Sequence, residues 1–451
     1  MDIKGKKICV CGMARSGMAA AELAARRGAA VTITDLKPED KLSGEVKRLE
    51  AAGIKALCGK NPENSLLDQT DILIISPGIR LDLPFVEHAR KAGALILPEI
   101  EFGWRFCRCH SLAVTGTNGK TTTASLLAEI MKLRHPASAA LGNIGEPLCA
   151  RAEALPEEAW AVLETSSFQL EAIVDFKPEI AALTQITPDH LDRHKTMENY
   201  AAAKARIFEN QDADGFLILN YDDESCREMS RAARGRVIYF SRREEREVSL
   251  KDGMLLLNLD GLRESVCHRD ELRILGDHNL ENAMCAIACA AAAGVPLDDI
   301  RKAVTGFAGV PHRIEFAGEV RGVRCYNDSK ATNSDSAIKG LLAMRGPTVL
   351  IGGGYDKSAD FSEWAALFAG RVRKLILIGE TAEKIAETCR AYGFTDIEKA
   401  NSLKDAVTVG FEHASPGDNL LLSPACASWD MFDNYEQRGD LFKEFVGEMR
   451  K

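Results

Sequence analysis

The stretch AVTGTNGKTTTASLLAEIM, residues 113–131, constrains the fold more than any other part of the chain. The run HSLAVTG that leads into it is typical of a buried strand, and the apolar residues at 126, 127, 130 and 131 recur at helical spacing. Gly119-Lys120-Thr121 is therefore predicted to lie at a strand-to-helix turn. Free backbone N–H groups and the positive end of the helix dipole meet at such a turn. With the mobile charge of Lys120, it favours a polyphosphate, and Thr121 would offer its hydroxyl to Mg²⁺.

The match to the phosphate-loop pattern G-x-x-x-x-G-K-[ST] is incomplete. Val114 stands where the first glycine is expected and the nearest glycine is Gly116, so the loop is shorter than usual. The alternative is a Gly/Thr helix cap with an ordinary surface lysine. A solvated cap does not explain so many hydroxyl and ammonium groups behind an apolar strand, so the pattern favours a nucleotide.

Composition indicates a multidomain globular protein. A chain of 451 residues has room for about three domains. With 46% hydrophobic and 27% charged residues it has the balance of a soluble globular protein, and no run approaches the roughly 18 apolar residues of a membrane span. The formal net charge of −9 argues against nonspecific nucleic-acid binding. We expect neither a membrane nor a nucleic-acid partner.

The thirteen cysteines contain no C-x-x-C pair, which indicates reduced thiols and a cytoplasmic protein. An N-terminal signal peptide is not expected, because Arg15 and Glu22 interrupt the apolar run early. Cys107, Cys109 and His110 form the one zinc-like cluster. The cluster lacks a second pair, so we interpret its cysteines as small buried hydrophobic residues.

The first part of the chain alternates KICVC, a helix from about Gly17 to Gly28, AAVTITD and DILIISPG, which predicts a Rossmann-like parallel sheet. The turn at 12–17 follows G-x-G-x-x-G, except that Ala14 replaces the middle glycine, and Asp35 ends the second strand. The extra methyl group disfavours NAD or FAD. A nucleotide placed differently, against Arg15, Ser16 and the loop 76–78, fits the same turn, and a Rossmann sheet without a ligand stays an alternative.

The second part starts near residue 98 and carries further polar groups at strand ends. Glu164 ends one predicted strand, and His190 and Asp192 follow another, which is where metal ligands and water-orienting groups lie in open α/β sheets. Lys204 lies on a predicted helix over 196–211, on an alanine-rich surface that permits close packing. Desolvation would lower its pKa and make it a neutral amine. An ordinary exposed helix lysine is the alternative.

Two amides, Asn279 and Asn282, share a face at the start of a long alanine-rich helix, where they could bind a base or a phosphate. The third part, from about residue 310, reads as a second doubly wound unit. Its polar loops 328–333, 353–357 and 423–428 each follow a predicted strand, so they are expected at one edge of the sheet.

The motifs occur in an order that resembles the Mur ligases of bacterial peptidoglycan synthesis, from the first part of the chain to its C-terminal end. They are TGTNGKTTT, GNIG, ETSSFQLE, TPDHLDRH, YAAAKARIFE, GDHNLENA, PHRIE, YNDSKATN, GGGYDKSADF and SPACASWDMFDNYEQRGDLF. The shortened phosphate loop is the form found in this family. YNDSKATN, SPACAS and YEQRGD are similar to those of the members that take D-glutamate.

The resemblance implies three α/β domains: a Rossmann-like domain for the UDP-substrate over 1–98, a central P-loop ATPase-type domain over 99–309, and a doubly wound Rossmann-like domain for the amino acid over 310–451. It implies three substrates, ATP, UDP-N-acetylmuramoyl-L-alanine and D-glutamate. We expect a monomer, although the sequence does not give the oligomeric state. It also implies an acyl phosphate, which turns a carboxylate with a poor leaving group into one that an amine can attack. The protein then has to position and neutralise anions.

The resemblance further implies the role of each matching residue. Lys120 is expected at the β- and γ-phosphates, and Lys204 is expected to become carbamylated so that it ligates one of two Mg²⁺ ions. The other implied metal ligands are Thr121, Glu164 and His190. The implied catalytic residues are Lys120, His190, Lys204, Asp328 and Lys330. The implied ATP-binding residues are Thr117, Asn118, Gly119, Lys120, Thr121, Thr122, Thr123, Asn282, Arg313 and Asp328. The implied UDP-substrate residues are Arg15, Ser16, Asp35, Gly78 and Asn143, and the implied D-glutamate residues are Thr332, Lys357, Ser428 and Tyr435.

Two other functions stay open at this point. One is an ATP-dependent amide ligase that uses a different amino acid, which the choice of amino acid in a phosphate-release assay would distinguish. The other is a regulatory module that senses NAD(H) through its first domain, against which Ala14 already argues.

Overall fold

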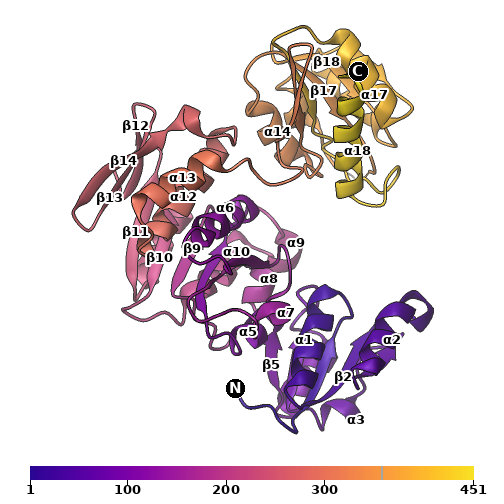
Figure 1. The fold of residues 1–451 in the computed structure, drawn as a ribbon. Coiled ribbons are helices and arrows are strands. Elements are labelled where there is room, and N and C mark those ends of the chain that lie inside the picture. The colour runs from indigo at the N-terminus through magenta and orange to yellow at the C-terminus, as the bar shows by residue number, and fades with distance from the viewer. Residues whose placement is uncertain (357–358, 451) are drawn as a thin grey trace. The chain divides into compact units, whose positions relative to one another are not determined.

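The computed structural model describes residues 1–356 and 359–450 and confirms the predicted α/β fold class. Three separate sheets follow one another along the chain (Figure 1). The chain forms two compact units, of which the first comprises residues 1–269 and 281–305 and the second comprises 270–280 and the residues from 306 onward. The first unit holds two of the sheets. The domain limits 1–98, 99–309 and 310–451 stay predictions.

The first sheet is parallel throughout, in the order β3-β2-β1-β4-β5. The chain reverses its direction of travel across the sheet beside β1, which creates the switch point where such sheets bind ligands. Its strands are β1 (Lys7–Cys11), β2 (Ala30–Asp35), β3 (Lys55–Cys58), β4 (Ile72–Ile75) and β5 (Leu95–Pro98). Its helices are α1 (Arg15–Arg26), α2 (Ser43–Ala51), α3 (Asn64–Leu67) and α4 (Pro84–Lys91). The helix predicted from about Gly17 thus starts two residues earlier.

The second sheet has the order β14-β13-β12-β11-β10-β9-β6-β8-β7, and its strands from β6 to β11 are parallel. These strands are β6 (His110–Thr115), β7 (Ala139–Gly142), β8 (Trp160–Glu164), β9 (Ile180–Leu183), β10 (Phe216–Asn220) and β11 (Arg236–Ser241). Its helices are α5 (Glu99–Trp104), α6 (Lys120–Lys132), α7 (Leu148–Arg151), α8 (Ser167–Leu170), α9 (Leu191–His194), α10 (Met197–Ala205), α11 (Glu224–Met229), α12 (Asp277–Ala292) and α13 (Leu297–Gly306). The helix predicted over 196–211 is α10, followed by a 3₁₀ turn at Arg206–Phe208.

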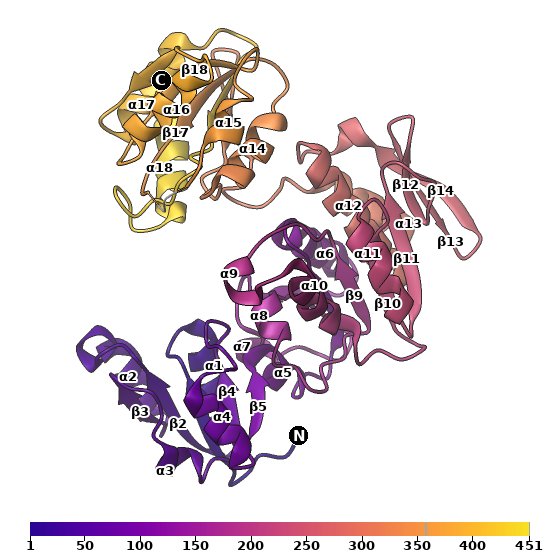
Figure 2. The same ribbon diagram turned by 180° about the vertical axis from the view of Figure 1, so that it is seen from behind.

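Three strands that the sequence analysis missed extend this sheet beyond β11 (Figure 2). They are β12 (Val248–Lys251), β13 (Met254–Leu259) and β14 (Leu262–His268), and β13 pairs antiparallel with both neighbours. The turns are Asp-Gly pairs at 252–253 and 260–261, and all four residues have positive φ. Asp-Gly between apolar runs is the strongest short-range hairpin signal, so the sequence did carry the information.

The third sheet has the order β15-β16-β20-β17-β18-β19 and is parallel except for the β15/β16 hairpin at one edge. Its strands are β15 (Glu315–Val320), β16 (Val323–Asn327), β17 (Thr348–Gly352), β18 (Val372–Leu377), β19 (Ile397–Lys399) and β20 (Asn419–Leu422). Its helices are α14 (Ser334–Leu342), α15 (Ser362–Ala365), α16 (Ala382–Ala391), α17 (Leu403–His413) and α18 (Tyr435–Glu448).

The first two sheets are joined by a shared core. Helix α1 packs on α5 and α7, and one apolar cluster combines Val10 and Leu23 of the first sheet region with Phe102, Phe106 and Cys149 of the second. Burial of this apolar surface fixes the two sheets relative to each other within the first unit. None of the helices described here is long and apolar enough to cross a membrane.

Candidate active site

The predicted phosphate loop lies between β6 and α6. Gly119 caps the helix with φ of 86°, and Gly116 has φ of 142°. A Cβ atom at Gly119 would lie 2.0 Å from Asn282 Oδ1, and one at Gly116 would lie 2.0 Å from Thr184 Oγ1. Both positions therefore require glycine. Val114, which replaces the first glycine of the usual pattern, is a buried residue of β6, so the loop itself begins at Gly116.

The first turn of α6 contains three threonines. Thr121 is half-buried, whereas Thr122 and Thr123 are buried. Thr123 Oγ1 has no hydrogen-bond partner among the described residues. Asn282 of α12 is also buried and lies against the loop at Gly119. The structure therefore brings these predicted ATP-binding residues together.

The loop is held from the opposite side by residues after β9. The Thr117 side-chain oxygen accepts hydrogen bonds from the Thr187 N–H at 3.0 Å and from the Tyr200 hydroxyl at 3.3 Å. Thr184 donates its hydroxyl to the Asn118 carbonyl at 2.5 Å. Thr117 thus shapes the loop with its side chain, while Asn118 contributes its carbonyl to the same contacts.

Two lysine side-chain nitrogens converge on one carbonyl of this loop. Lys120 Nζ donates to the carbonyl oxygens of Gly116 at 3.0 Å and Thr117 at 2.8 Å, and Lys204 Nζ donates to the Gly116 oxygen at 2.7 Å. Lys204 is only 2% exposed, which excludes the alternative of an ordinary surface lysine. Burial, reinforced by the charge of Lys120, lowers the pKa of Lys204 well below its usual value.

Tyr200 is a residue of this site that the sequence analysis did not single out. It is 1% exposed, and Lys204 Nζ lies 4.7 Å from the centre of its ring. Burial raises the pKa of Tyr200 to about 12, so the hydroxyl stays protonated and donates to Thr117. Its spacing of four residues from Lys204 on one helix was the available signal.

Glu164 ends β8 as predicted and is buried at 2% exposure. Its Oε1 accepts a hydrogen bond from Asn143 Nδ2 at 2.7 Å. Its Oε2 is buried and has no hydrogen-bond partner in the described part of the chain. A buried carboxylate oxygen without a partner is costly, and a cation would satisfy it.

His190 lies at the N-terminal end of α9 with φ of 52°. Its Nε2 is 3.4 Å from Asp189 Oδ2, and its ring packs edge-on against Phe168 at 4.9 Å between ring centres. The charges of Asp189 and Glu164 both act on Lys204 and oppose the lowering of its pKa. Asp189 is therefore a second residue of the site that the sequence analysis missed, although it precedes the predicted His190 directly.

The donor set fits Mg²⁺ only together with phosphate oxygens. Among residues 1–356 and 359–450, no three His, Cys, Asp or Glu side chains gather into a metal site. Mg²⁺ is usually held by one or two carboxylates plus substrate phosphates and water. Glu164, whose Oε2 has no hydrogen-bond partner among the described residues, supplies such a carboxylate. The Thr121 hydroxyl, on the first turn of α6, is a second oxygen donor of the predicted set.

Asp35, the acid predicted at the end of the second strand, holds the turn after β1 by hydrogen bonds to the backbone. Asp35 accepts hydrogen bonds from the backbone N–H groups of Met13 at 2.7 Å and Lys37 at 2.9 Å.

Asp192, predicted as a metal-ligand or water-orienting residue, is exposed, and its carbonyl oxygen accepts a hydrogen bond from Lys195 Nζ at 2.5 Å.

Three predicted UDP-substrate positions gather near the same turn. Arg15 donates to the carbonyl of Gly145, in the loop that also carries the exposed Asn143. Ser16 is half-buried at the start of α1, and Gly78 is exposed in the loop that follows β4. The structure therefore links the first-domain turn to the GNIG loop after β7.

The second unit carries its own group of predicted residues, at the ends of β16 and β20. Asp328 Oδ2 accepts a hydrogen bond from Ser423 Oγ at 2.7 Å, and Oδ1 accepts one from the Ile314 N–H at 3.3 Å. Burial raises the pKa of Asp328 to about 7, against the opposing effect of Ser423 and of the Arg313 charge. Arg313 Nε is buried and has no hydrogen-bond partner among the described residues.

Lys330 and Tyr435 lie together, with Lys330 Nζ 5.2 Å from the centre of the Tyr435 ring. Thr332 is half-buried, and its N–H donates to the Lys330 carbonyl at 2.9 Å. Ser428 is buried in the loop after β20. Lys357, the predicted cation for D-glutamate, lies outside the described residues.

Arg438 of α18 was not predicted as a site residue, yet its hydrogen bonds connect the loop after β16 to the loop after β20. Its guanidinium is completely buried and donates to Ser329 Oγ at 3.0 Å, to the Ser329 carbonyl at 2.8 Å and to the Cys426 carbonyl at 3.1 Å. Burial lowers the pKa of Arg438 to about 10. Its sequence signal was position: it shares the buried face of α18 with Phe442 and Val446, four and eight residues on.

A shortened phosphate loop on a parallel sheet, with a Rossmann-like sheet before it and another after it, defines a nucleotide-binding protein of three α/β sheets. Family models agree with this class. The chain matches the Mur ligase MurD-like N-terminal domain over 6–97, the Mur ligase middle domain over 114–290, and the Mur ligase, glutamate ligase domain over 312–426. The chain belongs to the Mur ligase family.

Curated relatives match over the whole length. The UDP-N-acetylmuramoylalanine–D-glutamate ligase of Alkaliphilus oremlandii (strain OhILAs) is 43% identical over 454 residues, and that of Thermoanaerobacter sp. (strain X514) is 44% identical over 455 residues. Each match covers 100% of both chains.

Solved structures show the same fold at low identity. UDP-N-acetylmuramate-alanine ligase MurC from Thermotoga maritima superimposes with a TM-score of 0.59 at 18% identity, covering 98% of this chain and 99% of that one. MurF from Acinetobacter baumannii gives 0.62 at 16%, covering 98% and 93%, and MurF from Thermotoga maritima in complex with ADP gives 0.57 at 15%, covering 84% and 96%.

Proposed function

We propose that this protein is an ATP-dependent ligase that joins D-glutamate to UDP-N-acetylmuramoyl-L-alanine through an acyl phosphate. Full-length relatives at 43% and 44% identity carry that ligase name. The γ-phosphoryl group of ATP passes to the alanyl carboxylate and ADP leaves. The amine of D-glutamate then attacks the carbonyl carbon, phosphate departs, and the amine nitrogen loses a proton.

The observation that carries this proposal is the convergence of Lys120 and Lys204 on the Gly116 carbonyl. Lys120 supplies a cation at the N-terminal end of α6, and Lys204 is held beside it at the same carbonyl, so Lys120 and the helix N-terminus form a site for a highly charged anion. Phosphoryl transfer depends on positioning and on neutralising charge, and this geometry supplies both. Lys120 holds the β- and γ-phosphates, and the N–H groups of the first turn of α6 add further donors.

We further propose that Lys204 acts as a carbamate. Its lowered pKa favours the neutral amine, and only the neutral amine attacks CO₂, forming the N–C bond and releasing one proton. Glu164, His190 and Thr121, with this carbamate, would hold two Mg²⁺ ions, which neutralise the phosphate oxygens when bound. The unpartnered Glu164 Oε2 supports this role.

The other substrates are assigned to the remaining groups. Arg15, Ser16, Asp35, Gly78 and Asn143 would bind the UDP-substrate. Asp328, Lys330 and Arg313 would act on ATP and the transferred phosphoryl group. Thr332, Ser428, Tyr435 and Lys357 would bind D-glutamate.

A cytoplasmic monomer is the working form that we propose. No disulfide joins any of the described cysteines, which suits a reducing compartment.

A phosphate-release assay tests the proposal. We expect release only when ATP, Mg²⁺, UDP-N-acetylmuramoyl-L-alanine and D-glutamate are all present, with L-glutamate and other D- and L-amino acids inactive. Mass spectrometry of the product should show one added glutamyl residue. Release with another amino acid, or without the UDP-substrate, would contradict the assignment.

A further inference from the structure

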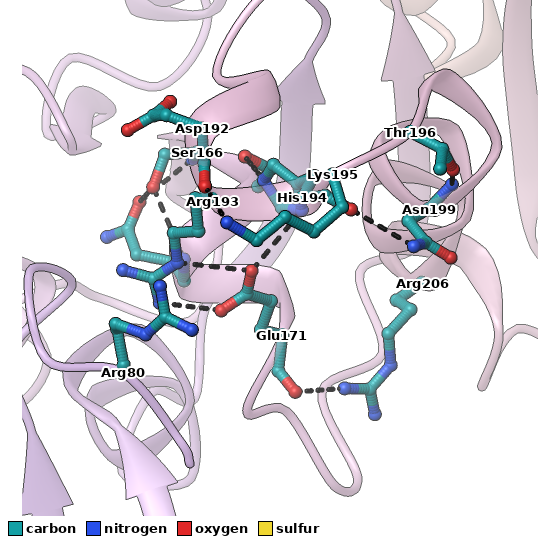
Figure 3. Close-up of polar contacts among 12 residues, drawn as sticks. Arg80, Ser166, Glu171, Asp192, Arg193, His194, Lys195, Thr196, Asn199 and Arg206 are labelled. Carbon is teal, nitrogen blue, oxygen red and sulfur yellow. Dashed lines mark hydrogen bonds and ion pairs between the residues drawn. The ribbon is translucent and has the colours of Figure 1, made fainter. Parts of the chain in front are cut away.

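A single arginine connects the segment of His190 to the first domain. Arg193 lies on α9 three residues after His190, and its guanidinium donates to both Glu171 carboxylate oxygens, at 3.3 Å from Nε and 2.6 Å from Nη2 (Figure 3). The same guanidinium donates to the carbonyl of Pro77 from Nη1 and to that of Ile79 from Nη2, each at 3.3 Å. The Arg193 guanidinium therefore bridges the Glu171 carboxylate and the loop 77–79.

The surroundings of this arginine are built to hold it in place. The guanidinium carbon lies 4.3 Å from the centre of the Phe168 ring, and the Arg193 side chain is only 13% exposed. The next residue, His194, is 3.4 Å from Glu171 through Nδ1 and 3.0 Å from Ser167 Oγ through Nε2. Two consecutive residues of α9, Arg193 and His194, thus contact the Glu171 carboxylate, as Figure 3 shows.

The segments joined in this way are those that carry the predicted metal ligands and part of the UDP site. Glu171 directly follows α8, in the segment that begins at Glu164 at the end of β8. Pro77 and Ile79 flank Gly78 in the loop after β4. A planar guanidinium with several donors can hold a carboxylate and two carbonyls simultaneously, which an ammonium cannot do in the same geometry.

We propose that Arg193, clamped by Glu171, is a positioning residue that fixes loop 77–79 of the first domain against the segments of Glu164 and His190. Its function is to set where the UDP-substrate lies relative to the phosphate loop. This inference rests on the proposed function, because it assumes that loop 77–79 contacts the UDP-substrate. Arg193 itself touches neither substrate nor metal in this scheme.

The test compares Arg193→Gln, Arg193→Lys and Glu171→Gln with the control Arg206→Gln. Arg206 donates to the Glu171 and Ile173 carbonyls and pairs with Glu209 at 2.7 Å, so the control removes contacts to the same segment from a side chain that makes no hydrogen bond to loop 77–79 within the described part of the chain. The measurements are the Kd of UDP-N-acetylmuramoyl-L-alanine by calorimetry without ATP, and KM for ATP and for the UDP-substrate.

Loss of two charge-assisted hydrogen bonds to loop 77–79 should raise Kd and KM for the UDP-substrate about tenfold in Arg193→Gln, with KM for ATP changed by less than about twofold. Glu171→Gln should show a smaller change in the same direction, and Arg206→Gln none. An unchanged Kd in folded Arg193→Gln, or equal increases in both KM values, overturns the inference.

Should Arg193→Gln fail to fold, Arg193→Lys decides by the same criterion, because it keeps a charge near Glu171 but cannot reach both carbonyls. The wild-type protein separates the two proposals. Failure of wild type to bind the UDP-substrate defeats the proposed function. Normal wild-type binding with unchanged binding by the arginine variants defeats only the positioning role.

Discussion

Replacement of Lys204 separates a chemical role from a structural one. Lys204 Nζ donates to the Gly116 carbonyl at 2.7 Å, and its side chain is 2% exposed. Removal of one group that helps to neutralise a developing charge typically costs about 10²–10³ in kcat, and the Lys204 carbamate would have this role by holding Mg²⁺. We therefore expect Lys204→Ala to lose at least about 10²-fold in phosphate release.

Partial recovery is expected when short carboxylic acids are added to Lys204→Ala, because the cavity left by the side chain can admit a carboxylate in place of the carbamate. Lys204→Met is the matched control, since methionine fills the volume without a nitrogen and leaves less room for the acid. We expect this variant to be inactive, to show no rescue, and to unfold at the same temperature as wild type or higher, because it no longer buries an amine.

The pH dependence follows from the direction of the Lys204 pKa shift. Because burial lowers the pKa, the neutral amine becomes available at lower pH than for a free lysine, and carbamylation should increase as pH rises through that lowered pKa. Measurements with labelled bicarbonate and nuclear magnetic resonance would detect the carbamate directly. Wild-type rates in Lys204→Ala without added acid would refute this reasoning.

Three further substitutions test other parts of the site. Lys120→Ala should lose about 10²-fold or more in kcat, with rates near wild type counting against its phosphate role. Gly119→Ala places a methyl group 2.0 Å from Asn282 Oδ1 at φ of 86°, so we expect weaker ATP binding by calorimetry and a loss of about 1–2 kcal/mol or more in unfolding free energy; an unchanged ATP Kd would show that the loop tolerates the shift. Asp328 has its pKa raised to about 7, so the folded state binds more protons than the unfolded state between about 4 and 7, and wild-type stability should fall across that range by up to about 4 kcal/mol. Asp328→Asn should lack this slope, and parallel stability curves for the two proteins would contradict the shift.

Much of the fold followed from local pattern. Apolar runs such as HSLAVTG and KICVC predicted strands that the structure contains as β6 and β1, and the glycine at 119 marked the start of α6. The β12–β14 strands were missed because their short runs resemble loops unless the two Asp-Gly turns are weighed. Their pairing depends on turn geometry rather than on long-range periodicity.

The sequence by itself determined which chemistry the chain carries. Gly116, Gly119 and Lys120 are dictated locally, because only glycine tolerates those backbone angles and a lysine at a helix start attracts phosphate. The family resemblance extended this to residues scattered along the chain, and full-length relatives agree with it.

Only the tertiary structure decided the environment of each group. By sequence Lys204 could have been a surface lysine, but packing of α10 against the loop buries it and lowers its pKa. Arg193 carries no local signal of its role, and Arg438 carries only its place on the buried face of α18, since their partners lie up to 116 and 109 residues away in sequence. Burial and electrostatics depend on everything that surrounds a side chain, so they exist only once distant segments have packed together.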